Sequence, residues 1–148
     1  QTMQLFNINR VIAASQGVGV AQGALDMAIK HVKQRKQFGQ PLGAFQAVQF
    51  KIAEMATWFE AARSLYYKAG WMIDHGKVDP KIISIAKYFA GEVGVKVANE
   101  ALQLHGGYGY IADYDIERFY RDAKIVEIYE GTKEIEKNTI ARELLGRL

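Results

Sequence analysis

With 148 residues, 49% of them apolar and 24% charged, the chain has the composition of one folded domain, which excludes disordered, fibrous and low-complexity classes. Its net charge of +3 comes without a basic stripe interleaved with aromatic residues, so we expect no nucleic-acid partner. The lack of cysteine excludes disulfides, a thiol nucleophile and cysteine-based zinc sites.

The first predicted helix runs from about Phe6 to Lys36. Its uncharged stretch, Val11–Leu25, is too short and too polar to cross a bilayer, and we expect no membrane partner. Gly17, Gly19 and Gly23 lower the helix propensity of this segment. We interpret these glycines as positions where a neighbouring backbone comes close, so the helix is predicted to pack against others along its length.

Pro41 is predicted to open the second helix, at a position where a missing backbone N–H is harmless. Apolar residues then recur every three or four positions as far as Ile73, which predicts a bundle helix about 45 Å long. Asp79 followed by Pro80 predicts the start of the third helix. The glycine pair that begins at Gly106 ends it.

A ring-rich loop is predicted over Tyr108–Tyr114, a short helix over Ile116–Ala123, and a last long helix from about Thr132 to Gly146. No linker or change of composition divides the chain. We therefore predict one all-α domain over residues 1–148, an antiparallel up-down four-helix bundle with a short extra helix before the last long helix.

Four-helix bundles often hold a pair of metal ions between Glu-x-x-His motifs that face inward. The three histidines are His31, His75 and His105, and none has a glutamate three residues before it. We therefore predict no metal site.

Glu130 stands between an aromatic ring and a glycine in the segment Ile128–Thr132 (IYEGT). A carboxylate in such a setting can act as a general base whose proton affinity is set by burial rather than by a metal. The alternative is a solvated residue at a helix start, where the helix dipole favours negative charge. On these five residues alone, the second interpretation is favoured.

Two other segments combine polar side chains with glycine. Arg35 stands beside Phe38, with Gln46 soon after, and a guanidinium can bind phosphate through two hydrogen bonds; the alternative is a solvated cation in the last turn of a helix. The adjacent Gly106 and Gly107 can be a simple helix cap or can admit a bulky ligand close to the backbone. Both pairs of interpretations remain open at this point.

In this order and spacing, these clusters resemble the C-terminal helical domain of the acyl-CoA dehydrogenases. Five segments in register are more specific than any one of them alone, and the resemblance covers essentially the whole chain. The matching segments are Arg35–Gly39 (RKQFG), Phe45–Ala47 (FQA), Gln103–Tyr110 (QLHGGYGY), Tyr120–Lys124 (YRDAK) and Ile128–Glu134 (IYEGTKE).

The resemblance implies an FAD-dependent α,β-dehydrogenation of an acyl-CoA thioester. It implies that Glu130 removes the α proton while the β hydrogen leaves as hydride to the flavin, and that the backbone N–H of Glu130 donates to the thioester carbonyl. Binding of FAD is implied for Arg35, Phe38, Gln46, Gln103, Gly106, Gly107, Thr132 and Glu134. Contact with the substrate is implied for Asn7, Arg10, Tyr129 and Gly131.

The resemblance implies that Gln103, Gly106 and Gly107 contact the flavin of a neighbouring subunit. One branch of the family carries its base immediately before the residue that matches Arg10. Asn9 stands there and cannot serve as a base, which favours Glu130.

The resemblance further implies a homo-oligomer, either a dimer or a tetramer, with an electron-transferring flavoprotein as acceptor. It implies an intracellular protein, cytoplasmic in a bacterium or in the mitochondrial matrix in a eukaryote. Full-length members also have an N-terminal helical domain and a middle β domain, so we expect this chain alone to self-associate but to show little or no activity. Two alternatives remain: a non-catalytic helical oligomerisation domain and an acyl-CoA oxidase. Together, Glu130, Arg35, Gln46 and Gln103 favour an enzyme over a purely structural domain.

Overall fold

The computed structural model describes residues 2–146, and its regular structure in that range is almost entirely helical, so the predicted all-α class is confirmed. The helices are α1 (Thr2–Gln34), α2 (Gln46–Asp74), α3 (Pro80–His105), α4 (Ile116–Val126) and α5 (Lys133–Leu145). The remaining pieces are two-residue strands and 3₁₀ turns: β1 (Lys36–Gln37), β2 (Gln40–Pro41), η1 (Leu42–Ala44) and η2 (Gly106–Tyr110).

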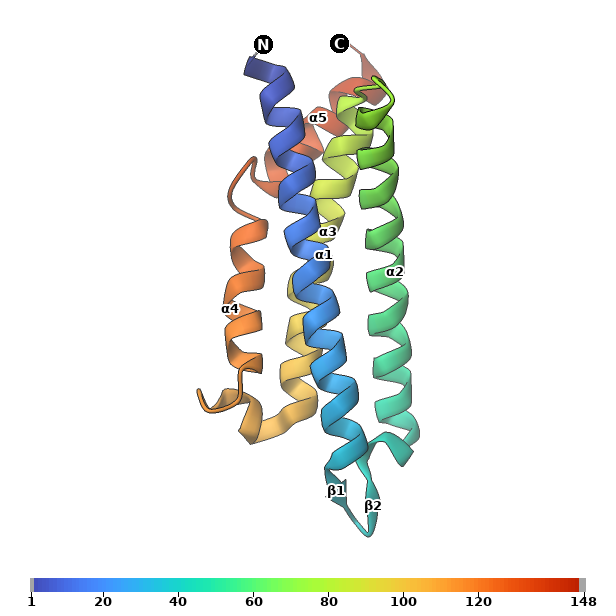
Figure 1. The fold of residues 1–148 in the computed structure, drawn as a ribbon, viewed down its shortest axis with the longest axis vertical. Coiled ribbons are helices and arrows are strands. Elements are labelled where there is room, and N and C mark those ends of the chain that lie inside the picture. The colour runs from blue at the N-terminus through green and yellow to red at the C-terminus, as the bar shows by residue number, and fades with distance from the viewer. Residues whose placement is uncertain (1, 147–148) are drawn as a thin grey trace.

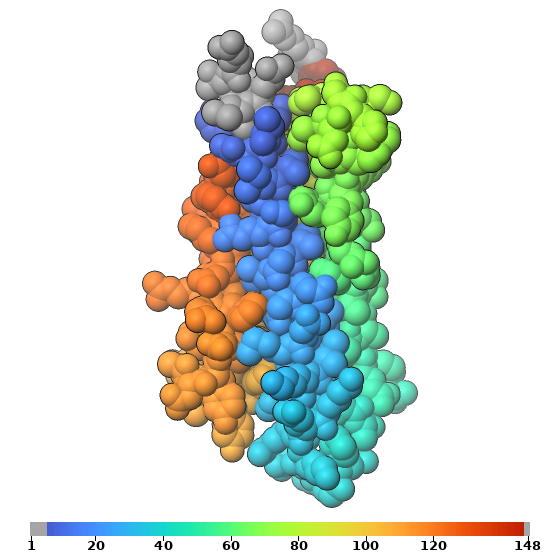
Figure 2. All heavy atoms as spheres, viewed as in Figure 1, coloured from blue at the N-terminus to red at the C-terminus, as the bar shows by residue number. Residues whose placement is uncertain are grey.

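The helices run alongside one another in an elongated molecule (Figure 1). The helix α1 packs most extensively against α3, and α2 and α4 lie on either side of this central pair. Figure 2 shows α4 and α2 covering the two flanks of α1. The last helix, α5, packs on α3, near the end where α1 begins. The short helix α4 therefore lies along the central pair, in contact with both α1 and α3.

Small side chains form the seam between α1 and α3. Among the fully buried residues are Ala14 and Ala21 on α1 and Ala90 and Ala98 on α3. A Cβ atom added at Gly17 would lie only 2.6 Å from the backbone oxygen of Ala90, so the two backbones approach too closely for any other residue there. The predicted close approach of a neighbouring backbone is thus confirmed at Gly17. It is wrong at Gly19, where nothing lies within 4 Å of an added Cβ, and at Gly23, where the neighbour is the ring of Phe119 rather than a backbone.

Side-chain caps set the starts of α3 and α5. The carboxylate of Asp79 accepts hydrogen bonds from the backbone N–H groups of Lys81 and Ile82, and Pro80 follows it at the first helical position. The hydroxyl of Thr132 accepts a hydrogen bond from the N–H of Ile135. Each cap satisfies N–H groups that have no partner within the helix, and both predicted starts are confirmed.

The connection between α1 and α2 differs from the prediction. The helix α1 ends at Gln34 rather than Lys36, and Pro41 lies in β2, paired with Lys36, so the prediction that it opens the second helix is wrong. The cause is the turn at Phe38 and Gly39, which have φ angles of +51° and +81°. Two successive residues with positive φ make the tight loop of a hairpin, and α2 starts only after η1.

Within residues 2–146, none of the helices combines the length and apolarity that a bilayer span requires. The core lies along the central pair, where Met55 and Phe59 of α2 and Ile116 and Ala123 of α4 join the buried alanines and valines of α1 and α3.

Candidate active site

The turn between α4 and α5 carries Glu130 in an unusual backbone conformation. Glu130 and Gly131 have successive positive φ angles of +52° and +102°. For a side-chain-bearing residue the left-handed region costs about 1–2 kcal/mol, and such strain persists only where the surroundings hold it. The turn leaves Glu130 half-buried, so its carboxylate is neither enclosed by this chain nor free in solvent.

Contacts from three helices hold this turn. The ammonium group of Lys87, on α3, donates a hydrogen bond to the carbonyl oxygen of Gly131. The hydroxyl of Tyr129 donates to the side-chain oxygen of Gln16 on α1. The backbone N–H of Lys133, at the start of α5, donates to the carbonyl of Glu127 at 3.2 Å.

A buried group of charged side chains lies beneath the turn. Nε of Arg10 lies 2.9 Å from Oε1 of Glu136, and the Glu136 side chain has no exposed area. Ser84 and Lys87 of α3 are also buried, with 0% and 1% of their surface exposed. Burial raises the pKa of Glu136 against the opposing effects of Ser84, Arg10 and Lys87. Burial likewise lowers the pKa of Lys87, although Glu136 opposes that shift.

Gly131 packs directly against this buried group. A Cβ atom at that position would lie 2.2 Å from Oε1 of Glu136 and 3.5 Å from Nε of Arg10. The positive φ already disfavours a side chain here, and the carboxylate removes the remaining space. A glycine after Glu130 is therefore required both by the backbone and by the ion pair.

The backbone N–H of Glu130 is free to bind a ligand. In the described part of the chain, neither the backbone nor the side-chain hydrogen bonds give this N–H an acceptor. This N–H therefore has no acceptor in the described chain, and it belongs to the same half-buried residue as the carboxylate. A base and a hydrogen-bond donor in this relation can act on one carbonyl compound, the base on its α proton and the donor on its oxygen.

The other predicted residues at this end have well-defined surroundings. Asn7 and Arg10 are buried on α1 and line a cavity of about 240 Å³ with residues of α5. Thr132 caps α5, so its hydroxyl already has a partner in the chain. Glu134 is fully exposed on the first turn of α5.

The remaining predicted cofactor residues lie at the opposite end of the bundle, around the hairpin. Phe38 is 92% exposed at its tip, and Gln46 is exposed at the start of α2. The guanidinium of Arg35 lies over the ring of Tyr108, 5.1 Å from its centroid. This contact joins the hairpin segment to η2 and confirms no ligand role by itself.

Gln103, Gly106 and Gly107 border η2 at the same end, and all three are exposed. Gly107 has an ordinary φ angle, and nothing lies within 4 Å of the place where its Cβ would be. Nothing within the chain therefore requires glycine at this position, in contrast to Gly131. Open space above exposed backbone is compatible with close approach by a group from outside the chain.

The predicted site residues thus form two groups that one chain does not bring together. Arg10 lies on α1 and Arg35 directly follows it, and the separation of 25 positions places the two groups about 38 Å apart at 1.5 Å per residue. Figure 1 shows the hairpin and the α4–α5 turn toward opposite ends of the bundle.

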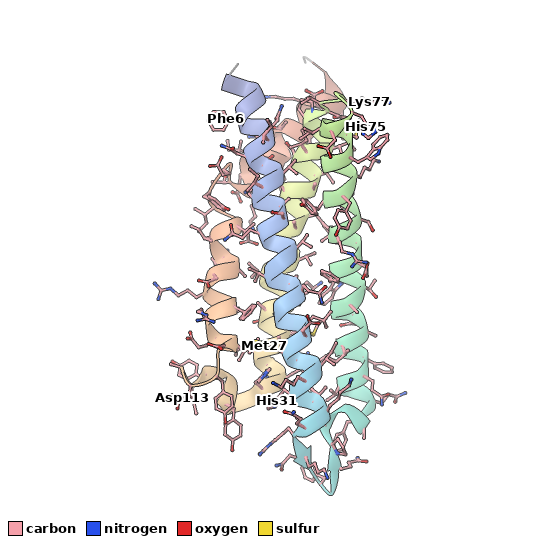
Figure 3. All side chains as sticks on the ribbon, in the orientation of Figure 1. Phe6, Met27, His31, His75, Lys77 and Asp113 are labelled. Atoms are coloured by element: carbon pink, nitrogen blue, oxygen red, sulfur yellow. The ribbon has the colours of Figure 1, made fainter. Side chains whose placement is uncertain are left out.

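Sequence reasoning missed three buried polar residues, Ser84, Lys87 and Glu136, and a pair of stacked histidines. The rings of His31 and His105 lie 4.1 Å apart, beside a cavity of about 260 Å³ that Met27 also lines. Figure 3 places Met27 and His31 on the half of α1 nearer the hairpin. In residues 2–146, no three histidine, aspartate or glutamate side chains gather in a cluster that could hold a metal ion.

The family model described as "Acyl-CoA dehydrogenase, C-terminal domain" matches residues 1–145. Over 143 residues, or 97% of the chain, the sequence is 50% identical to a 3-(aryl)acrylate reductase of Clostridium sporogenes, of which it covers 38%. It is 48% identical over 145 residues, or 98% of the chain, to a subunit of the caffeyl-CoA reductase-Etf complex of Acetobacterium woodii, again covering 38%.

Among solved structures, the butyryl-CoA dehydrogenase of Megasphaera elsdenii superposes with a TM-score of 0.95 at 43% sequence identity. The match covers 97% of this chain and 37% of that one. The chain therefore spans somewhat more than a third of the length of the relatives that it matches.

Proposed function

Because the chain belongs to the acyl-CoA dehydrogenase family, as the C-terminal domain of its members, we propose that it supplies the base of an FAD-dependent oxidoreductase acting on the α,β bond of acyl-CoA thioesters. The base is Glu130. The observation that carries this proposal is the strained turn at Glu130, a half-buried residue whose backbone N–H has no acceptor in the described chain.

The chemistry requires both groups of Glu130. An α proton next to a thioester is too weakly acidic for a carboxylate to remove in water, and hydrogen bonds to the thioester oxygen make the reaction feasible by stabilising the developing negative charge. The N–H of Glu130 can supply one such bond while the carboxylate takes the proton. When bound, FAD would accept the β hydrogen as hydride.

The residues around the hairpin fit a large, flat, phosphate-bearing cofactor. Phe38 offers an exposed ring, Gln46 and Gln103 offer exposed amides, and Arg35 offers a cation for phosphate. Gly107 leaves open backbone. Because this group lies far from Glu130 along α1, we propose that it contacts the FAD of a neighbouring subunit in a homo-oligomer, whereas Thr132 and Glu134 lie on the side of the subunit's own FAD.

The reverse direction is a second candidate, favoured by the names of two relatives. The similar proteins of Clostridium sporogenes and Acetobacterium woodii are both named as reductases. In that direction Glu130 returns a proton to the α carbon, because the same group serves as base and acid in the two directions. The second relative is named as part of an Etf complex, which supports an electron-transferring flavoprotein as redox partner rather than oxygen.

Replacing Glu130 by Gln in the full-length enzyme tests the function. The variant keeps the shape and loses the base, so we expect acyl-CoA-dependent flavin reduction to slow by at least about 100-fold. Glu54→Gln, at an exposed position of α2, is the matched control and should leave the rate within about twofold. An oligomerisation domain would show equal rates for all three proteins.

Rates measured with saturated and with α,β-unsaturated thioesters decide the direction of the reaction. Reoxidation of the reduced flavin by air as fast as by the electron-transferring flavoprotein would identify an oxidase.

A further inference from the structure

Lys87 is buried on a face of α3 that is apolar apart from Ser84. Only 1% of its surface is exposed, and Ile83 and Ala90 flank it on the same face of α3. A lysine is almost never fully buried unless its charge has a partner. Its position therefore requires an explanation that hydrophobic packing does not give.

The ammonium group of Lys87 is bonded to the main chain of the active-site turn. It donates to the carbonyl oxygen of Gly131, and within residues 2–146 it forms no ion pair with a carboxylate. Glu136, the nearest candidate for such a pair, is already held by Arg10 at 2.9 Å. Lys87 therefore does more than neutralise a buried charge, because its hydrogen bond is made to the peptide group that follows Gly131.

The carbonyl of Gly131 directly follows two successive residues with positive φ angles, Glu130 at +52° and Gly131 at +102°. The direction of the Gly131 carbonyl is fixed by the torsions of this pair, and the same torsions set where the carboxylate and the N–H of Glu130 point. A hydrogen bond from a charged group is about twice as strong as one between neutral groups, and it acts on the turn that the left-handed glutamate strains. The bond from Lys87 therefore helps to hold the strained turn.

We propose that Lys87 is a positioning residue, which fixes the directions of the Glu130 carboxylate and N–H through the carbonyl of Gly131. The inference rests on the proposed function, in which Glu130 is the base. Lys87 itself lies under the turn, behind Gly131, and does not touch the substrate. A misplacement of about 1 Å at a reacting group can slow a reaction about 100-fold. Loss of this bond should therefore lower the rate of the chemical step and leave substrate affinity nearly unchanged.

The test compares Lys87→Met, which removes the donor, with Lys87→Arg, which keeps a charged donor, in the full-length enzyme. Two rates are measured per bound flavin: anaerobic flavin reduction by the acyl-CoA substrate, and exchange of the α hydrogen with deuterium in D₂O. For Lys87→Met we expect both to fall about 10- to 100-fold, with KM within about threefold of the wild-type value. Lys87→Arg should recover at least part of the loss. Lys81→Met, on the first turn of the same helix, is the matched control with unchanged rates.

A purely structural role would lower the melting temperature and the flavin content of Lys87→Met while leaving both rates per bound flavin unchanged, and that result overturns the inference. The same holds if Lys87→Arg is as slow as Lys87→Met. Should Lys87→Met fail to fold, Lys87→Gln replaces it, since an amide keeps a donor without the charge. Glu130→Gln is measured alongside: full activity there refutes the proposed function, whereas an inactive Glu130→Gln with a fully active Lys87→Met refutes only the role of Lys87.

Discussion

The two ends of the bundle hold their polar residues in opposite ways. At the α4–α5 turn, Arg10, Lys87 and Glu136 are buried and contact each other or the backbone of the turn. At the hairpin, Phe38, Gln46 and Gly107 are exposed. One end is therefore already organised by its own chain, whereas the other leaves these residues exposed. Residues proposed for one site can therefore lie far apart within one chain.

The largest expected difference between the two ends is in the free energy of unfolding after a cation is removed from each. Arg10→Met leaves the carboxylate of Glu136 buried without its ion-pair partner, and we expect the free energy of unfolding to fall by about 3–5 kcal/mol. In the flavin-free protein, Arg35→Met removes a contact with the ring of Tyr108, worth about 0.5–1 kcal/mol. Urea denaturation of the full-length protein measures both.

A double variant checks the cause assigned to Arg10. Combining Arg10→Met with Glu136→Met removes both charges, so most of the lost stability should return. If the double variant is as unstable as Arg10→Met alone, the ion pair is not what organises this end.

Alanine in place of glycine should change stability less than the arginine replacements do, and the two ends should respond in different properties. Gly131→Ala forces a Cβ to within 2.2 Å of the Glu136 carboxylate, at a φ of +102°, and should cost about 2–3 kcal/mol together with most of the activity. Gly107→Ala meets no atom of its own chain within 4 Å and should change stability by less than about 0.5 kcal/mol. The flavin content of the purified variant is the informative measurement there, because we expect it to fall in Gly107→Ala. Wild-type flavin content in that variant would remove Gly107 from the cofactor site.

The pH dependence of stability should run in opposite directions at the two ends, and this is the smallest effect. Burial raises the pKa of Glu136 above its ordinary value of 4.5, so just above that pH the folded state binds more protons than the unfolded state. Its contribution to the free energy of unfolding therefore decreases as pH rises from 4.5 through the folded-state pKa. Glu136→Gln should remove this slope from denaturation midpoints measured across that window.

At the hairpin end, burial, His105 and Arg35 lower the pKa of His31 below its ordinary value of 6.5. The folded state then binds fewer protons than the unfolded state just below that pH, so stability falls as pH decreases from 6.5 through the folded-state pKa. His31→Gln should flatten this part of the profile. A profile unchanged by the substitution would contradict a lowered pKa of His31.

Much of the fold follows from local sequence. The cap at Asp79 with Pro80 and the cap at Thr132 were predictable because each depends on residues within a few positions. The hairpin was not, since Phe38 followed by Gly39 lacks the asparagine or aspartate that usually marks such a loop. A proline at the edge of a short strand satisfies the same backbone rule as a proline at a helix start, and local pattern alone did not separate them.

The segment of Glu130 was singled out from the sequence as a candidate site, but the residues that hold its turn were not. Glu130 and Gly131 belong to a short segment, whereas the ion pair joins Arg10 and Glu136 from opposite ends of the chain. One signal was available: Lys87 interrupts the apolar stripe of α3, four residues after the buried Ile83. A lysine on a stripe that packs in the core indicates a buried partner, although only the structure identifies that partner as a backbone carbonyl.

The seam at Gly17, where α1 and α3 pack closely, lies between the hairpin and the α4–α5 turn. Because Gly17 admits no side chain against Ala90, the close contact at this point sets the register of α1 on α3. Each residue of a helix advances it by about 1.5 Å and turns it by about 100°. Loss of one residue between Gly17 and Arg35 would turn the hairpin end by about 100° relative to Glu130, leaving every functional side chain intact yet misdirected. The number of residues in this half of α1 is thus as constrained as their identity.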